Sequence, residues 1–422
     1  MDVLPDEIIY HICGYLQSVN DRRELSRVSK RIAAIVDESW LSFANQRGWK
    51  KDSESKSWKD ICRDYFLFRK RWFTGKMAVK RLYFDSKANS RNKNVLTSLG
   101  KSGDNIGIGT ESYVSCYRLE MDEKTSEYYS NQYQHLPMET AENSLCMSKM
   151  RMSAIDEFSP DLVISDLKSV KIKRVPLNTS VSVEKCHQTA SHIIMIMDDG
   201  TIDVYFLDTG AMRTISEEKN EISFSSVEED HLLIVSFWSK SVVIFDLFQL
   251  KCHPIFVMSL NYVLYSFTYR FQKSTGKRFL FFGSADGDVG KISITLCSEN
   301  GAAAKVFPSA HTDSVYCTGH NGSVLASGGA DGKVVFWSLD GNLLHSDESA
   351  HVGVVRHIFL NKWLMITAGD AREIMVWDPT TFIVRHVFHQ NPIKVKFMLA
   401  DETSVVYGSP DSKFVIFLSV NY

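Results

Sequence analysis

AHTDSVYCTGHNGSVLASGGADGKVVFWSLD, residues 310–340, is the stretch of sequence that decides the fold. It consists of short apolar runs separated by turn residues such as His-Asn-Gly-Ser and Ala-Asp-Gly, a pattern typical of β-strands joined by tight turns. A second stretch, AHVGVVRHIFLNKWLMITAGDAREIMVWDP at residues 350–379, repeats the same features in the same order. Two consecutive copies of one pattern predict a repeat architecture.

The repeat extends over the strand-rich part of the chain. The aromatic or apolar residues that end each third strand are separated by 40, 47, 45, 40 and 40 positions. A period of 40–45 residues, with four short strands in each unit, indicates a β-propeller and resembles the WD repeat. The residues aligned are Tyr205, Phe245, Ile292, Trp337, Trp377 and Phe417.

The polar residues of these repeats predict structural hydrogen bonds. Residues 310–340 contain His, Ser, Asp and Trp at the spacing of the hydrogen-bonded tetrad of the WD family, namely His311, Ser327, Asp331 and Trp337. The next repeat keeps His351, Thr367 and Trp377, but Ala371 replaces the aspartate and Asp370 falls one place early. We therefore interpret these residues as structural, not as catalytic pairs.

The blade count follows from the three-strand cores, which lie near 94–119, 145–175, 182–207, 221–247, 260–294, 314–339, 354–378 and 393–419. We predict eight blades; the alternative is seven, with 94–175 forming one irregular blade. The last core lacks an outer strand, and AVKRLYFD at residues 78–85 is expected to supply it, because closing the ring removes exposed edges. The polar stretches 86–94 and 121–143 are predicted to be loops.

Composition excludes several classes of protein. The 422 residues are 44% hydrophobic with a net charge of −2, which indicates globular domains. Residues 1–76 carry 15 Lys and Arg against 11 Asp and Glu, too small an excess for a nucleic-acid protein. No apolar run reaches the length of a membrane span, and the eight scattered cysteines form no C-x-x-C pair, so we expect no metal site and a cytosolic or nuclear protein.

The N-terminal residues have helical patterns. LPDEIIYHICGYL, residues 4–16, places Ile8, Ile9, Ile12 and Leu16 on one face of a helix. Residues 18–40 predict a second helix, which begins at a capping box formed by Asp21 and Glu24. Residues 57–73 predict a third, whose aromatic residues are expected to be core and whose bases at 69–71 are expected to be solvated.

These helices resemble an F-box. The Leu-Pro start, the acidic residues, the Ile-rich first helix and LSRVSKRI carry the resemblance over residues 2–45, and the alternative is a helical cap on the β domain. The resemblance implies an F-box at 2–48, linker helices at 49–76 and a WD-repeat propeller at 77–422. It also implies docking on a Skp-family linker through Leu4, Pro5, Ile8, Ile9, Ile12, Leu16, Leu25 and Val28.

An F-box followed by a propeller resembles the F-box/WD-repeat family. The resemblance implies a non-catalytic, cofactor-free substrate-recognition subunit of a Skp–cullin–F-box ubiquitin ligase, in which the propeller binds the protein to be ubiquitylated. The chain has no nucleophile elbow, phosphate-binding glycine loop or H-E-x-x-H motif. The alternative function is a propeller scaffold that does not direct ubiquitylation.

The substrate is expected on the propeller face that carries the loops between second and third strands. The bases placed there by the sequence are Lys168, Lys240, Arg372 and Lys413, and Arg356 lies near the start of an inner strand. Arginine binds phosphate or carboxylate with two parallel hydrogen bonds, as in phosphorylated degradation signals. The alternative is a rim of solvated charges. We take Arg356, Arg372, Lys240 and Lys413 as the candidate substrate-binding residues.

Overall fold

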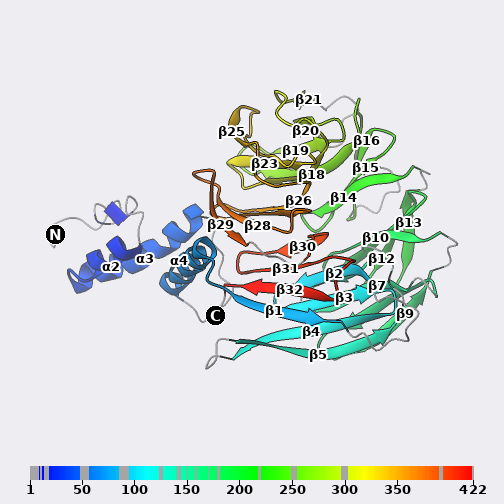
Figure 1. Ribbon diagram of the computed structural model, residues 1–422, viewed down its shortest axis with the longest axis horizontal. Coiled ribbons are helices and arrows are strands. Elements are labelled where there is room, and N and C mark those ends of the chain that lie inside the picture. Colours follow the sequence, from blue (N-terminus) through cyan, green and yellow to red (C-terminus); the bar gives the residue numbers. More distant parts are fainter. Residues whose placement is uncertain are drawn as a thin grey trace.

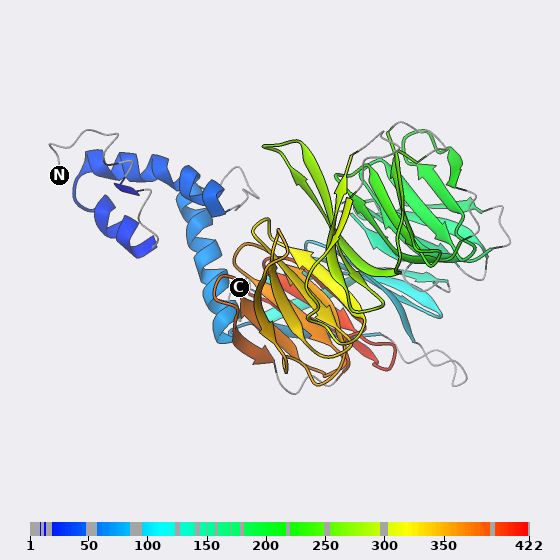
Figure 2. The ribbon, with the colours of Figure 1, turned by 90° about the horizontal axis from the view of Figure 1, so that it is seen from above.

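The computed structural model describes residues 9, 12–13, 19–47, 57–84, 95–122, 127–138, 140, 144–148, 150–156, 159–169, 171–177, 181–216, 220–248, 254–295, 303–388 and 393–420. Eight four-stranded antiparallel sheets form most of the molecule, and helices lie at one side of them (Figure 1). The view from above also shows these helices projecting away from the sheets (Figure 2).

Each sheet is one blade, numbered in chain order. Blade 1 contains β2 (Leu96–Ser102), β3 (Asn105–Thr110), β4 (Tyr113–Asp122) and β5 (Glu127–Pro137). Blade 2 contains β6 (Cys146–Met147), β7 (Arg151–Asp156), β8 (Asp161–Asp166) and β9 (Ile172–Pro176). Blade 3 contains β10 (Val183–Gln188), β11 (His192–Met197), β12 (Ile202–Phe206) and β13 (Met212–Ser216). Blade 4 contains β14 (Ile222–Glu228), β15 (Leu232–Phe237), β16 (Ser241–Asp246) and β17 (Phe256–Ser259).

The second half continues the pattern. Blade 5 contains β18 (Leu264–Gln272), β19 (Lys277–Ser284), β20 (Val289–Ile294) and β21 (Ala303–Val306). Blade 6 contains β22 (Val315–His320), β23 (Val324–Gly329), β24 (Val334–Ser338) and β25 (Leu343–Asp347). Blade 7 contains β26 (Val355–Leu360), β27 (Met365–Gly369), β28 (Ile374–Asp378) and β29 (Ile383–Phe388). Blade 8 contains β30 (Phe397–Ala400), β31 (Ser404–Gly408), β32 (Phe414–Ser419) and, from the other end of the chain, β1 (Ala78–Tyr83).

The predictions of eight blades and of ring closure are confirmed. Strand β1 pairs antiparallel with β32 from Ala78 opposite Ser419 to Tyr83 opposite Phe414. Separate apolar clusters fill every interface between successive blades, including the one between blades 8 and 1, where Leu82 and Phe417 are buried together. Each blade is therefore packed on both of its faces, which is why middle strands such as β11 are buried at every position.

Strand β5 contradicts the prediction that residues 121–143 form a loop. It pairs with β4 from Glu127 opposite Asp122 to Pro137 opposite Tyr113. Its polar side chains are accommodated because it is the outer strand of blade 1, where one face can meet solvent. Residues 86–94, the other predicted loop, lie outside the described residues.

The helices are α2 (Val19–Ser26), α3 (Lys30–Arg47) and α4 (Trp58–Thr74). The single helix predicted over residues 18–40 is wrong, because Ser29 accepts a hydrogen bond from the Ile32 backbone N–H at 3.2 Å and so caps the start of α3. The predicted capping box is also wrong: α2 begins at Val19, and Glu24 pairs with Arg27 instead. The third predicted helix is confirmed as α4, with Ser57 as its N-cap.

Within the described residues, no helix is long and apolar enough to cross a membrane, and no group of three metal-binding side chains occurs. The six described cysteines are free thiols, and all but Cys146 are buried.

Candidate functional site

The loops of the propeller fall on two opposite faces, because neighbouring strands of a blade are antiparallel. The upper face carries the turns between second and third strands and the connections from an outer strand to the next blade. The lower face carries the turns between first and second strands and between third and outer strands. This division places each candidate residue on one face or the other.

Helix α4 packs on the lower face of blades 7 and 8. The buried indole of Trp72 donates its Nε1–H to the carbonyl oxygen of Glu402 at 3.0 Å, in the first turn of blade 8. The Arg71 guanidinium donates to the Val420 carbonyl at 2.6 Å, directly after β32. Tyr65 meets Trp363 edge to face, at 6.2 Å between ring centroids, in the first turn of blade 7. These contacts fix the helix to the propeller.

Asp378 strengthens this junction from the end of β28. Its side chain is only 3% exposed and accepts hydrogen bonds from Arg69 of α4 at 3.2 Å and from Arg385 of β29 at 3.1 Å. Burial alone would raise the pKa of Asp378, but the hydrogen bonds from Thr380 and Arg385 and the charge of Arg69 hold it below the ordinary value. The prediction that the bases at 69–71 are solvated is therefore wrong for Arg69 and Arg71.

The other helices are held together around a buried arginine. The guanidinium of Arg22, 1% exposed, donates to Ser39 Oγ at 2.6 Å and to the Cys13 carbonyl, and it lies 5.3 Å from the Trp40 ring centroid. A buried charge needs such partners to offset its desolvation. Its acceptors come from segments distant in the sequence, so the burial of this arginine becomes evident only in three dimensions.

The predicted linker-binding residues lie in different environments. Ile9 and Leu25 are buried in the core of the helical unit, and Ile12 is partly buried against it. Val28, in the turn between α2 and α3, is 54% exposed and open to a partner. The other predicted residues, Leu4, Pro5, Ile8 and Leu16, lie outside the described residues.

On the upper face, a β-bulge recurs at the start of the first strand in blades 1, 3, 4, 5, 6 and 7. In each of these strands the pairing register skips the second residue. A bulge of this kind leaves the extra residue out of the ladder and re-aims its side chain, often beside a functional site. The residues placed in this way are Thr97, Glu184, Ser223, Tyr265, Tyr316 and Arg356.

Three of these residues and a neighbouring tryptophan form a continuous row, which we call the upper-face row: Trp238, Tyr265, Tyr316 and Arg356. Trp238 meets Tyr265 edge to face at 5.5 Å, and Tyr265 stacks on Tyr316 at 5.4 Å between centroids. The Arg356 guanidinium lies 5.6 Å from the centre of the Tyr316 ring. Trp238 is 48% exposed and Tyr316 37%, so the row offers rigid aromatic surface across blades 4 to 7.

The charged end of the row is a fixed ion pair. Arg356 binds Asp370 through two hydrogen bonds, of 2.8 and 3.0 Å, and Lys396 lies 3.6 Å from the same carboxylate. The hydrogen bond from Arg356 is the main cause that lowers the pKa of Asp370, and it also raises the pKa of Arg356. The guanidinium is therefore charged but already engaged by a carboxylate.

Comparison of the tetrads in blades 6 and 7 explains why the Asp370 carboxylate is available to pair with Arg356. In blade 6, His311 binds Asp331 at 3.1 Å and Ser327 at 2.8 Å, and Trp337 donates to Ser327 at 3.0 Å, as predicted. Blade 7 keeps the equivalent bonds of Thr367 with His351 and Trp377, of 2.8 and 2.9 Å. Within the described residues, however, the buried Nδ1 of His351 has no hydrogen-bond partner. The one-place shift of Asp370 has moved its carboxylate from the tetrad to Arg356.

The other predicted bases occupy turns. Arg372 and Lys240 have left-handed backbones, with φ of 58° and 63°, in the second turns of blades 7 and 4. The Lys240 ammonium donates to the Asn261 carbonyl at 3.1 Å, whereas the exposed Arg372 side chain makes no ion pair with any described residue. Lys413 is exposed in the second turn of blade 8. Lys168 follows the third strand of blade 2 and so lies on the lower face, contrary to the prediction.

The structure thus brings only Arg356 of the predicted residues into the row, and the aromatic residues were missed. Their signal in the sequence is a large side chain directly after the first buried residue of the strand, as in Leu264-Tyr265 and Val315-Tyr316.

Comparison with known proteins addresses both parts of the chain. Residues 1–44 match the family model described as F-box-like, and no curated protein matches the chain. The fold is similar to that of the computationally designed Ika8 protein, with a TM-score of 0.61, 14% identity, and 77% of this chain and 96% of that one covered. It is also similar to Sqt1 of Saccharomyces cerevisiae, with a TM-score of 0.61, 11% identity and coverage of 81% and 98%. BamB from Moraxella catarrhalis gives a TM-score of 0.57, 10% identity and coverage of 81% and 98%.

At these identities the solved structures show the fold alone, so the N-terminal match and the blade count carry the assignment. The chain combines an F-box-like N-terminal segment with an eight-bladed β-propeller, an architecture consistent with that of F-box/WD-repeat proteins.

Proposed function

We propose that this protein is the substrate-recognition subunit of a Skp–cullin–F-box ubiquitin ligase. The F-box-like domain binds the Skp-family linker and through it a cullin, and the upper face of the propeller binds the protein to be ubiquitylated. The chain itself does no covalent chemistry. The F-box-like match over residues 1–44 supports the linker role, and the free cysteines fit the reducing cytosol or nucleus.

One observation carries the proposal most directly. The helical unit is fixed to the lower face of blades 7 and 8, whereas the upper-face row lies on the opposite face of blades 4 to 7. The two surfaces can therefore engage different proteins at the same time, as an adaptor requires.

The first prediction concerns linker binding. The full-length protein is expected to co-purify with a Skp-family linker. Val28→Asp is expected to weaken the complex at least about tenfold, since a valine that becomes buried on binding contributes about 1.5–3 kcal/mol. Binding to the purified linker is measured by calorimetry. Leu67→Asp, at an exposed apolar position on α4, is the matched control and should bind normally.

Failure of the unaltered protein to bind any Skp-family linker would contradict the ligase assignment and favour a propeller scaffold. Ile9 and Leu25 are unsuitable for this test, because an acidic residue in the helical core would unfold the unit that is being tested.

The second prediction concerns the substrate. Replacing Trp238 and Tyr316 together by Ser removes the two most exposed rings of the row, and aromatic anchors of this kind dominate protein interfaces. The proteins that accumulate when this protein is removed should then have half-lives at least severalfold longer in cells carrying the variant. Half-lives are measured after synthesis is blocked, with linker binding checked in parallel.

Phe248→Ser is the matched control, because this ring is 65% exposed in a lower-face turn of blade 4. Unchanged turnover in the double variant, with linker binding intact, would place the substrate elsewhere.

Charge reversal of Arg372 tests the phosphate hypothesis separately, because Arg356 is already engaged by Asp370.

A further inference from the structure

Blade 5 has an unusually long first hairpin. Strands β18 and β19 contain nine and eight residues, and no other blade in the described part of the chain has first and second strands of that length. The end of this hairpin, from Arg270 to Phe279, lies towards the lower face. Its side facing blade 6 forms the wall of a pocket.

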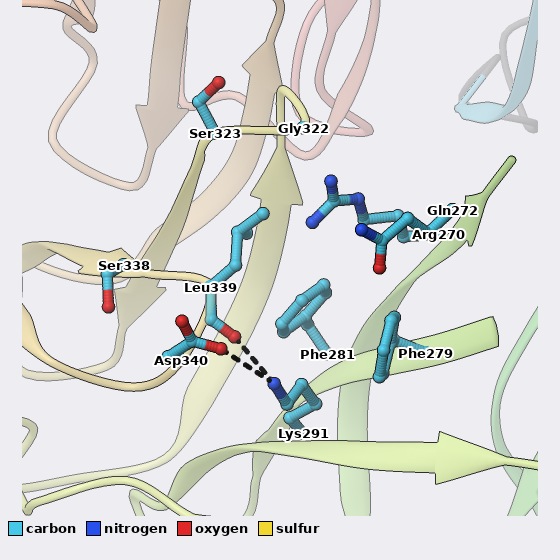
Figure 3. A pocket seen from close by; sticks show the side chains of 10 residues that line it. All are labelled: Arg270, Gln272, Phe279, Phe281, Lys291, Gly322, Ser323, Ser338, Leu339 and Asp340. Carbon is cyan, nitrogen blue, oxygen red and sulfur yellow. Dashed lines mark hydrogen bonds and ion pairs between the residues drawn. The ribbon is translucent and has the colours of Figure 1, made fainter. Parts of the chain in front are cut away.

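The pocket has a volume of about 360 Å³ and lies between blades 5 and 6 (Figure 3). One wall is the face of blade 5 that presents Arg270, Phe279, Phe281 and Lys291, which are cross-strand neighbours in the sheet. The other wall consists of two lower-face turns of blade 6, at residues 322–323 and 338–340. This volume is within the range of small-ligand sites, roughly 300–1,000 Å³.

The pocket is electropositive. The half-buried Arg270 side chain points into it and makes no hydrogen bond or ion pair with any described residue (Figure 3). Lys291 donates to the Leu339 carbonyl at 3.0 Å and lies 3.4 Å from Asp340, whose side chain is 88% exposed. A carboxylate so exposed to water compensates little of the positive charge. An unpartnered guanidinium beside an ammonium favours an anion.

Between the two cations lies an aromatic surface. Phe279 and Phe281 stand on β19, with Arg270 on β18 to one side and Lys291 on β20 to the other. The Lys291 ammonium lies 5.0 Å from the Phe279 ring centroid. A ligand that reaches Arg270 therefore also contacts the face or edge of a phenylalanine ring.

We propose that this lower-face pocket binds an aromatic anion, with a phosphate or carboxylate on Arg270 and an aryl group against Phe279. The aryl anion is either a small molecule or a side chain such as phosphotyrosine in a protein. The site is separate from the upper-face row and lies on the same face as the helical unit.

The test uses the full-length protein with phenyl phosphate and benzoate as probes, titrated by calorimetry. Saturable binding is expected, at least about tenfold tighter than inorganic phosphate, because burial of a ring adds about 1.5–3 kcal/mol. Arg270→Gln should weaken binding at least about tenfold, since it removes charge-assisted hydrogen bonds. Lys277→Gln, the same charge change at an exposed position of the same hairpin, is the control.

Ser323→Trp provides an independent variant, because it places a large ring at a residue that lines the pocket without a change in charge and should weaken binding. Tighter binding of a phosphotyrosyl peptide than of phenyl phosphate would identify a protein source, and equal affinity would identify a small molecule. No saturable binding by either probe, or unchanged affinity in a folded Arg270→Gln protein, would overturn the proposal.

Discussion

Replacement of residues 78–83 by a Gly-Ser segment of equal length is expected to abolish the single cooperative unfolding transition of the propeller. The exchange removes the outer strand of blade 8 and leaves β32 as an unpaired edge. One of the side chains removed, Leu82, is buried in the interface between blades 8 and 1. Truncation of a single buried side chain of this kind costs about 2–5 kcal/mol. The free energy of unfolding of a domain is only about 5–15 kcal/mol, so the exchange should remove most or all of the stability of the propeller.

Calorimetry and size-exclusion chromatography measure the result, which should be aggregation or a broad transition at lower temperature. Val79→Ser is the control, because this residue lies on the same strand and is largely exposed. A sharp transition at the parent temperature in the Gly-Ser protein would mean that β1 does not close the ring.

Asp378→Asn is expected to loosen α4 from the propeller. The change leaves Arg69 and Arg385 without their buried counter-charge, and lost hydrogen bonds to charged groups cost about 1.5–3 kcal/mol. Hydrogen exchange of the α4 amides, at residues 58–74, should then be at least about tenfold faster. Mass spectrometry of the full-length protein measures this exchange.

Blade 4 offers a matched control. Asp246 also ends a third strand and accepts a turn hydrogen bond, from the Phe248 backbone N–H at 2.9 Å. Within the described part of the chain, however, no hydrogen bond or ion pair joins Asp246 to a helix. Asp246→Asn should leave the α4 amides unchanged. If Asp378→Asn also leaves them unchanged, the contacts of Trp72, Arg71 and Tyr65 are sufficient to hold the junction.

Much of the fold follows from the sequence because the repeat is periodic. The residues aligned at Tyr205, Trp337 and Phe417 all lie in third strands, since each blade must bury the same position against its neighbour. Strand β5 was missed because an outer strand needs only one apolar face, so its pattern reads as a loop. The break before α3 was missed because Ser29 stands inside a continuous helical periodicity and acts as a cap only in three dimensions.

The candidate site was less predictable. A β-bulge depends on pairing register, which the sequence does not display, so Tyr265 and Tyr316 appeared to be ordinary strand residues. The sequence identified Arg356 but not its partner, because Asp370 was compared only with the aspartate position of the tetrad. In the structure the Asp370 carboxylate pairs with Arg356 instead. The contacts of Arg22 and Arg69 could not be predicted for one reason: their acceptors, at Ser39 and Asp378, lie in segments distant in the sequence.

Closure of the ring by β1 also sets a constraint on how the chain is made. Ala78 can pair with Ser419 only after the ribosome has added Ser419, 341 residues later. At roughly 5–20 residues per second, β1 remains without its partner for roughly 20–70 s. Throughout that time its edge and the apolar side of α4 are available to chaperones or to another nascent chain. Biogenesis should therefore depend on chaperone supply more strongly than the stability of the finished ring would suggest.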